Sequence, residues 1–236
     1  MTMVNERKDI SRRGLMKAAA IGVFGGALVG IASPRRAFAD LNQKANGFSP
    51  SLVVKAVDSS TGKLLAIVRE TIEPAWHESR MSEAKEAAAP GGLVECWQTD
   101  EGTSGLISAT SRIPLRASAY REETKESDDG LELYVKLVLG VSWGEGQSSI
   151  QIQRGSFSVS QKSPLVTYSN TGYAMMQKSR FVSDLFNEPE LTVETGWPAD
   201  SFNTATDQYT CGGAVTGSGF NLMTGEEIYY TVELYL

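Results

Sequence analysis

Residues 131–143 read LELYVKLVLGVSW, with apolar side chains at every second position from Leu131 to Trp143. Polar residues such as Lys136 and Ser142 interleave with them. Successive side chains of a strand point to opposite faces, so this alternation predicts one long strand with a single buried face. Such a strand needs a second layer of structure over its apolar side, which makes this stretch decisive for the fold class.

The segment after this strand predicts a hairpin with a local irregularity. The stretch GEGQ (144–147) supplies a turn, and residues 149–160 supply the returning strand. Its apolar residues occupy even positions before Arg154 and odd positions after Gly155: Ile150, Ile152, Phe157 and Val159. One extra residue is needed to keep both sets on one face, so we predict a β-bulge at or beside Gly155.

The sequence predicts further strands before and after this hairpin. A hairpin is predicted over 51–70, where two apolar runs flank the polar turn 58–63. Further strands are expected at 113–120, 165–181, 209–221 and 228–236, and residues 184–207 are expected to be irregular. Because no crossover helices separate the strands, the sequence predicts an all-β, antiparallel β-sandwich, with a barrel as the alternative.

One helical signal interrupts the β pattern. Residues 75–89 are rich in Ala, Glu and Lys and lie between Pro74 and the Pro90-Gly91-Gly92 turn. Good helix formers between such breakers favour one short helix or an ordered loop.

The first 39 residues have the plan of an export signal. A basic segment precedes fifteen uncharged residues (18–32), and small residues follow at Ala37 and Ala39. A bilayer-spanning helix needs roughly 20 apolar residues, so we expect cleavage before Asp40 and no stable membrane anchor. An uncleaved anchor is the alternative. The signal segment itself is expected to be disordered or helical.

The basic segment contains SRRGLMK (11–17), which resembles the twin-arginine (Tat) export consensus. The residues that carry the resemblance are Arg12, Arg13, Leu15, Met16 and Lys17. The resemblance implies export of a folded protein to the extracytoplasmic space, as a secreted or envelope-associated protein, with the Tat translocase and signal peptidase as partners. An ordinary secretory signal is the alternative.

Removing the signal leaves one mature β domain, 40–236, with a core unit at about 112–236. Cleavage removes seven of the 22 Lys and Arg and two of the 28 Asp and Glu, which leaves 15 basic and 26 acidic residues and a formal net charge of −11. This charge disfavours nucleic acid as a partner, because nucleic-acid binders carry a basic surface.

Two cysteines remain, Cys96 and Cys211. Because disulfides persist outside the cytoplasm, we expect a Cys96–Cys211 bridge, with two inert buried thiols as the alternative.

The residues offer no recognisable catalytic or metal site. His77 is the only histidine of the chain, and no G-x-S-x-G or phosphate-binding glycine motif occurs. We therefore expect no cofactor and no metal, while a pair of carboxylates without a motif keeps hydrolase chemistry open.

Three aromatic residues suggest a binding surface. Trp197 lies in the irregular segment, and Tyr229 and Tyr235 alternate with the apolar residues of the last strand. Exposed rings on a sheet suit a glycan or protein ligand. The alternative is that they pack against a second layer or pair across strands.

The stretch VSWGEGQSSIQIQRGSFSVS (141–160), followed by TGWPADSF and CGGAVTGSGF, resembles uncharacterised secreted β-proteins of Gram-positive bacteria, including gut actinobacteria. The resemblance implies no activity. The expected function is therefore a non-catalytic extracellular binding module, and the alternative is a secreted hydrolase or cofactor-bearing enzyme.

Overall fold

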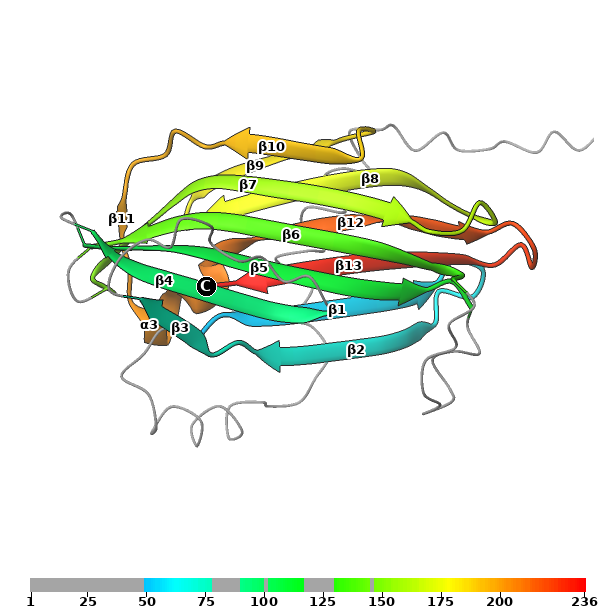
Figure 1. Cartoon of the computed structure of the whole chain (residues 1–236), viewed down its shortest axis with the longest axis horizontal. Coiled ribbons are helices and arrows are strands. Elements are labelled where there is room, and N and C mark those ends of the chain that lie inside the picture. Colours follow the sequence, from blue (N-terminus) through cyan, green and yellow to red (C-terminus); the bar gives the residue numbers. More distant parts are fainter. Residues whose placement is uncertain (1–48, 78–89, 100–101, 117–129, 145–146) are drawn as a thin grey trace, which may run out of the picture.

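Two β-sheets stack face to face to form the protein (Figure 1). The computed structural model describes residues 49–77, 90–99, 102–116, 130–144 and 147–236. Sheet A has six strands in the order β2-β1-β13-β12-β8-β9, and sheet B has the order β10-β7-β6-β5-β4-β3 with β11 beside β7. The predicted all-β sandwich is confirmed, and the sheets do not close into a barrel.

The strands of sheet A are β1 (Ser51–Asp58), β2 (Leu64–Thr71), β8 (Val166–Gln177), β9 (Arg180–Leu185), β12 (Cys211–Asn221) and β13 (Glu227–Tyr235). Those of sheet B are β3 (Pro74–His77), β4 (Gly91–Thr99), β5 (Gly102–Pro114), β6 (Glu132–Trp143), β7 (Ser149–Gln161), β10 (Glu190–Glu194) and β11 (Asp200–Ser201). All pairs are antiparallel except β3 with β4, which is parallel.

The core lies between the two sheets. The alternate residues of β6 from Leu133 to Trp143 are buried in it, as the sequence pattern predicts. Phe157 of sheet B stacks on Tyr173 of sheet A with ring centroids 4.8 Å apart. Beside this pair Gly155 has no side chain, and a Cβ there would lie 2.5 Å from Sδ of Met175, so the small residue makes room for the methionine of the opposite sheet.

The β-bulge predicted beside Gly155 is present in β7. Gly140 of β6 pairs with Arg154, but its neighbour Val141 pairs with Ile152, so Gln153 is the extra residue. Its insertion lets the apolar residues on both sides of the bulge face the core despite their different parity.

The hairpin predicted over 51–70 is confirmed as β1 and β2, which pair antiparallel. The last strand is β13, and it lies inside sheet A, hydrogen-bonded to β1 on one side and β12 on the other. Removing it would open the sheet in the middle.

Other expectations are corrected. Residues 74–77 form strand β3 where a helix or loop is predicted, because Pro74 to His77 pair with β4; residues 78–89 lie outside the described residues. The segment 165–181 holds β8 and the start of β9. Of the strand predicted at 113–120, only the first two residues belong to a strand, at the end of β5, and residues 117–120 lie outside the described residues. The segment 184–207 holds β10, β11 and the short helix α3 (Thr204–Asp207).

The core also extends beyond the unit 112–236. Strands β4 and β5 occupy 91–99 and 102–114, and they contribute Val94, Ile107 and Ala109 to it. The sequence pattern assigns no strands there, since glycine and hydroxyl residues break the apolar alternation.

The predicted disulfide is absent from the structure, in which Cys96 and Cys211 are free, buried thiols. The two residues lie on β4 and β12, in different sheets. A bridge between them would therefore have to cross the core from one sheet to the other. Burial raises the pKa of both thiols, to about 12 for Cys96.

The signal residues Arg12, Arg13, Leu15, Met16, Lys17, Ala37, Ala39 and Asp40 lie outside the described residues. Within the part that the structure describes, no helix has the length and apolar character needed to span a bilayer.

A Gly155→Ala substitution should destabilise the fold by about 1–3 kcal/mol, because the new methyl group overpacks the core against Met175 and Phe157. Denaturant unfolding measures the loss. The matched control is Gly140→Ala on β6, whose Cβ would approach only the flexible side chain of Arg154, 3.0 Å from its Cγ. An equal loss in both variants would contradict this account of the core.

Candidate functional site

A row of outward-facing residues crosses four strands of sheet B. Trp97 of β4 is opposite Ser104 of β5, which is opposite Ser142 of β6, which is opposite Gln151 of β7. Their strand neighbours Cys96, Val141, Ile150 and Ile152 are buried in the core. Side chains alternate along a strand, so the row lies on the face of sheet B that points away from sheet A.

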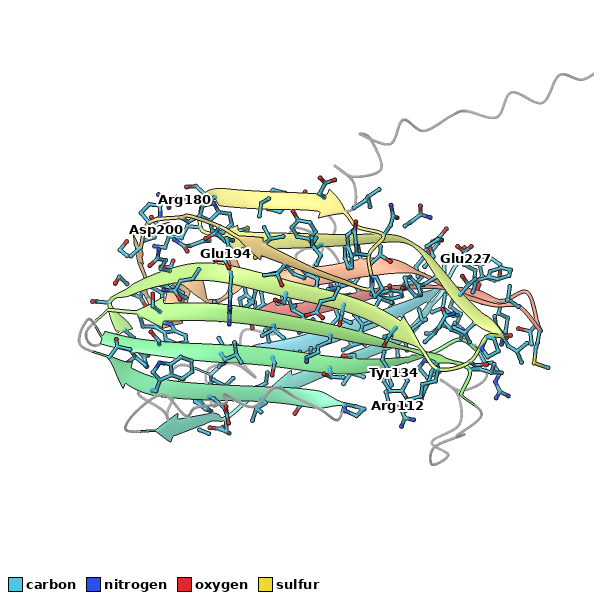
Figure 2. The ribbon with its side chains drawn as sticks, turned by 45° about the horizontal axis from the view of Figure 1, so that its top comes forward. Arg112, Tyr134, Arg180, Glu194, Asp200 and Glu227 are labelled. Atoms are coloured by element: carbon cyan, nitrogen blue, oxygen red, sulfur yellow. The ribbon has the colours of Figure 1, made fainter. Side chains whose placement is uncertain are left out.

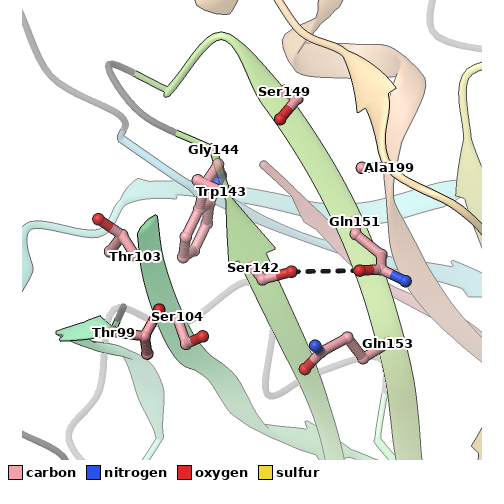
Figure 3. Close-up of a pocket in the computed structure, with 10 residues that line it drawn as sticks. All are labelled: Thr99, Thr103, Ser104, Ser142, Trp143, Gly144, Ser149, Gln151, Gln153 and Ala199. Atoms are coloured by element: carbon pink, nitrogen blue, oxygen red, sulfur yellow. Dashed lines mark hydrogen bonds between the residues drawn. The ribbon is translucent and has the colours of Figure 1, made fainter. Parts of the chain in front are cut away.

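A groove of about 200 Å³ lies over three residues of this row, Ser104, Ser142 and Gln151 (Figure 3). Hydroxyl and carboxamide side chains dominate its lining, and no charged side chain is among the residues that line it: Thr99, Thr103, Ser104, Ser142, Trp143, Gly144, Ser149, Gln151, Gln153 and Ala199. The small serine, glycine and alanine residues leave the space, and the extra residue of the bulge, Gln153, forms part of the wall.

Hydrogen bonds fix the orientation of the central amide. Ser142 Oγ donates to Gln151 Oε1 at 3.4 Å, the contact drawn in Figure 3, and Gln151 Nε2 donates to the backbone carbonyl of Trp197 at 2.5 Å. Among the described residues, the side chains of Ser104, Ser149 and Gln153 have no hydrogen-bond partner. These groups are available to a ligand, and each can donate as well as accept.

One wall of the groove comes from the segment between β10 and β11. Its anchor is Gln177 of β8, which is fully buried. Gln177 Nε2 donates to the carbonyl of Pro198 and to Asp200 Oδ2, both at 2.8 Å, and Gln177 Oε1 accepts from the backbone N–H of Ile152 at 2.7 Å. One side chain thus ties Ala199 and its neighbours to β7.

An ion pair secures the same segment from outside. Arg180 of β9 contacts the Asp200 carboxylate, and the two residues lie together at the end of the sandwich (Figure 2). The hydrogen bond from Gln177 and the Arg180 guanidinium together lower the pKa of Asp200. Nearby, Lys178 pairs with Asp207 of α3 at 2.8 Å.

The three aromatic residues expected to form a binding surface do not come together. Trp197 is half-buried beside the groove on sheet B and supplies only its carbonyl to Gln151. Tyr229 is 46% exposed on sheet A, but Tyr235, six residues along the same strand, is 5% exposed. Tyr209 packs edge-on against the Tyr235 ring, with centroids 5.3 Å apart, and this contact buries a face that strand alternation alone would leave open.

The groove residues are not singled out by the sequence pattern. Ser142 and Gln151 are the polar positions of two predicted strands, which is the one local signal they carry. Trp97 and Ser104 lie in strands that the pattern does not assign. That the four residues are neighbours follows from the register of four strands, which no single segment encodes.

Two acids that are buried outside the groove have cationic partners. Glu132 accepts from Arg112 Nη2 at 2.6 Å and from the Tyr134 hydroxyl at 2.5 Å. Glu233 on sheet A contacts Lys55 Nζ at 2.9 Å, and burial raises its pKa. Glu132 lies on sheet B and Glu233 on sheet A, and neither is among the residues that line the groove. Among the described residues, no group of three or more His, Cys, Asp or Glu side chains is placed to hold a metal ion.

Comparisons of this chain with protein-family models, with curated proteins and with solved structures return no match. The function is therefore argued from the site.

A Gln177→Leu substitution should destabilise the protein by about 1–3 kcal/mol, because it leaves the buried N–H of Ile152 without an acceptor and releases the groove wall. Chemical denaturation gives the stability, and hydrogen exchange of the Ile152 amide gives the local effect. Gln161→Leu, at an exposed position of β7, is the control and should change neither. Unchanged exchange at Ile152 in the Gln177 variant would show that this amide is not the anchor.

Proposed function

We propose that the protein is a non-catalytic extracytoplasmic binding module whose groove on sheet B takes an uncharged, hydroxyl-rich ligand of the glycan class. The observation that carries the proposal is the lining of the groove. Serine, threonine and glutamine side chains dominate it, and no charged side chain lines its volume of about 200 Å³.

This lining matches the chemistry of a saccharide. Sugar hydroxyl groups donate and accept hydrogen bonds at once, and Ser, Thr and Gln side chains do the same. Because Gln151 is held by Ser142 and by the Trp197 carbonyl, its amide is oriented before a ligand arrives, which lowers the entropic cost of binding.

Trp97 adds an aromatic group to the same row. It is half-buried, opposite Ser104, and two residues before the lining residue Thr99. Trp97 is not among the residues that line the groove, but its indole lies on the same face of sheet B and offers an apolar surface for a sugar unit that extends beyond the groove. The strand register thus brings together hydrogen-bonding groups and an aromatic ring, the combination that a glycan needs.

The hydrolase alternative finds less support. Glycosidases use two carboxyl groups that flank the scissile bond, and none of the described residues that line the groove is acidic. Cleavage of a bound glycan would favour this alternative over the binding module.

We also propose that the protein reaches this location through the Tat pathway, with the translocase and signal peptidase as partners. The support is the SRRGLMK segment and the short apolar run that follows. Two free, buried thiols suit a protein that folds in the reducing cytoplasm before it is exported.

Glycan-array screening of the mature protein should find a neutral oligosaccharide ligand. Gln151→Ala should then weaken its binding about fivefold to thirtyfold, the loss expected for one or two hydrogen bonds of about 1 kcal/mol each. Trp97→Ala should weaken it further, since the stacking surface is lost. Calorimetric titration measures both.

Tyr229→Ala, at an exposed ring on sheet A, is the control and should bind as the unaltered protein does. Thermal melting must show the groove variants folded. Failure to bind any neutral glycan, or equal affinity in all three variants, would reject the groove as the site.

Replacing both Arg12 and Arg13 by lysine should stop export, because the Tat receptor reads the arginine pair itself. Fractionation of the host followed by immunoblotting would find the unprocessed chain in the cytoplasm. Normal export of the double-lysine variant would point to the general secretory route.

A further inference from the structure

Strand β2 forms one edge of sheet A and pairs, among the described strands, with β1 alone. Figure 1 shows it as the outermost strand on its side of the molecule. Most of its residues are exposed, including the apolar side chains of Leu64 (49%), Ile67 (41%) and Val68 (54%). Val68 lies on the side of sheet A that faces the core, yet it is the most exposed of the three.

The backbone of this edge is also open. Ile72 donates its N–H to Pro50 O at 2.8 Å, and antiparallel hydrogen-bonded pairs recur at every second residue. Val68 and Glu70 therefore bond to β1. Ile67, Arg69 and Thr71 direct their N–H and C=O groups away from the sheet, where they form an unpaired ladder.

This edge strand carries only part of the usual protection. Soluble proteins block such edges with proline, with inward-pointing charges or with bulges. Residues 66–71 contain no proline, and the one irregularity of the strand lies at its start, between the pairs Ala56–Ala66 and Val57–Leu64. Glu70, on the same side as Val68, is the one inward-pointing charge of the strand.

We propose that β2 pairs antiparallel with β2 of a second copy of this chain, around a two-fold axis at Val68, and joins two copies of sheet A into one continuous sheet. This inference does not depend on the groove or on its ligand.

Charge complementarity favours a second copy of this chain as the partner of β2, and it favours one register of the strand pair. Lys63 and Glu73 are exposed, and they lie five residues before and five residues after Val68. In an antiparallel pair centred on Val68, each Lys63 meets Glu73 of the other copy, so the interface is self-complementary. A pair centred on Arg69 would instead place two arginines opposite each other, which destabilises a strand pair.

The same register pairs the free backbone N–H and C=O groups and brings apolar side chains of the two copies into contact. Ile67 of one copy lies opposite Arg69 of the other, so both outward ladder positions find partners. The two Val68 side chains meet in a non-hydrogen-bonded pair, where the cross-strand distance is shortest. The apolar surface of β2 that is exposed in one copy is thus covered by β2 of the second copy.

Sedimentation velocity of the mature exported protein over a concentration series is the first test. We expect a shift from monomer to dimer mass as the concentration rises. Lys63→Glu and Glu73→Lys, each alone, should shift the species back to monomer, because each places like charges together at both ends of the strand pair. The two substitutions combined should restore the dimer.

Ile67→Pro tests the backbone ladder, since it removes an N–H that points away from β1. It should abolish the dimer while Ile67→Ala, the matched control, weakens it less; thermal melting checks that both variants fold. A protein that stays monomeric at every concentration overturns the proposal, as does a dimer that the charge reversals leave intact. Glycan binding by such a protein would leave the proposed function standing, so the two failures are distinguishable.

Discussion

The fold depends on one constraint, the burial of the apolar face of β6 between the two sheets. Every second side chain from Leu133 to Trp143 is buried there, and β6 has long antiparallel partners on both sides, β5 and β7. Burial of apolar area is the largest favourable contribution to folding, and a one-residue slip in register would turn this whole set outward. The bulge at Gln153 satisfies the constraint in β7, because it moves the apolar residues after it back onto the core face.

The groove follows from the same constraint. Once Val141, Ile150 and Ile152 face the core, Ser142 and Gln151 must face outward, and the extra residue Gln153 joins them at the groove. Gln177 then couples the groove to the opposite sheet, since it belongs to β8 of sheet A and holds the segment after β10 against β7 of sheet B. These hydrogen bonds tie the groove wall to both sheets, as the proposed recognition of a ligand by hydrogen bonds of fixed direction requires.

The order of strands in sheet A explains why β2 is the edge that we propose for pairing. The last strand, β13, lies inside sheet A between β1 and β12, so β2 of the N-terminal hairpin is left at the rim. Its apolar residues and its open ladder are consequences of that position. The proposed ligand site and the proposed pairing edge lie on different sheets, so the two proposals do not exclude each other.

The sequence by itself determined the features with a local period: the alternation of β6, the hairpin of β1 and β2, the bulge beside Gly155 and the terminal strand. A period of two is a property of consecutive residues, which is why these features can be predicted without knowing their partners. Tertiary structure alone decided the rest. Strands β4 and β5 form despite a weak apolar pattern, because partners on both sides supply hydrogen bonds and burial that their own residues do not signal. Tyr235 is buried by Tyr209 from another element, the two cysteines lie in different sheets, and the groove residues become neighbours through the register of four strands. These are contacts between distant segments, and their energy exists only once the chain has folded.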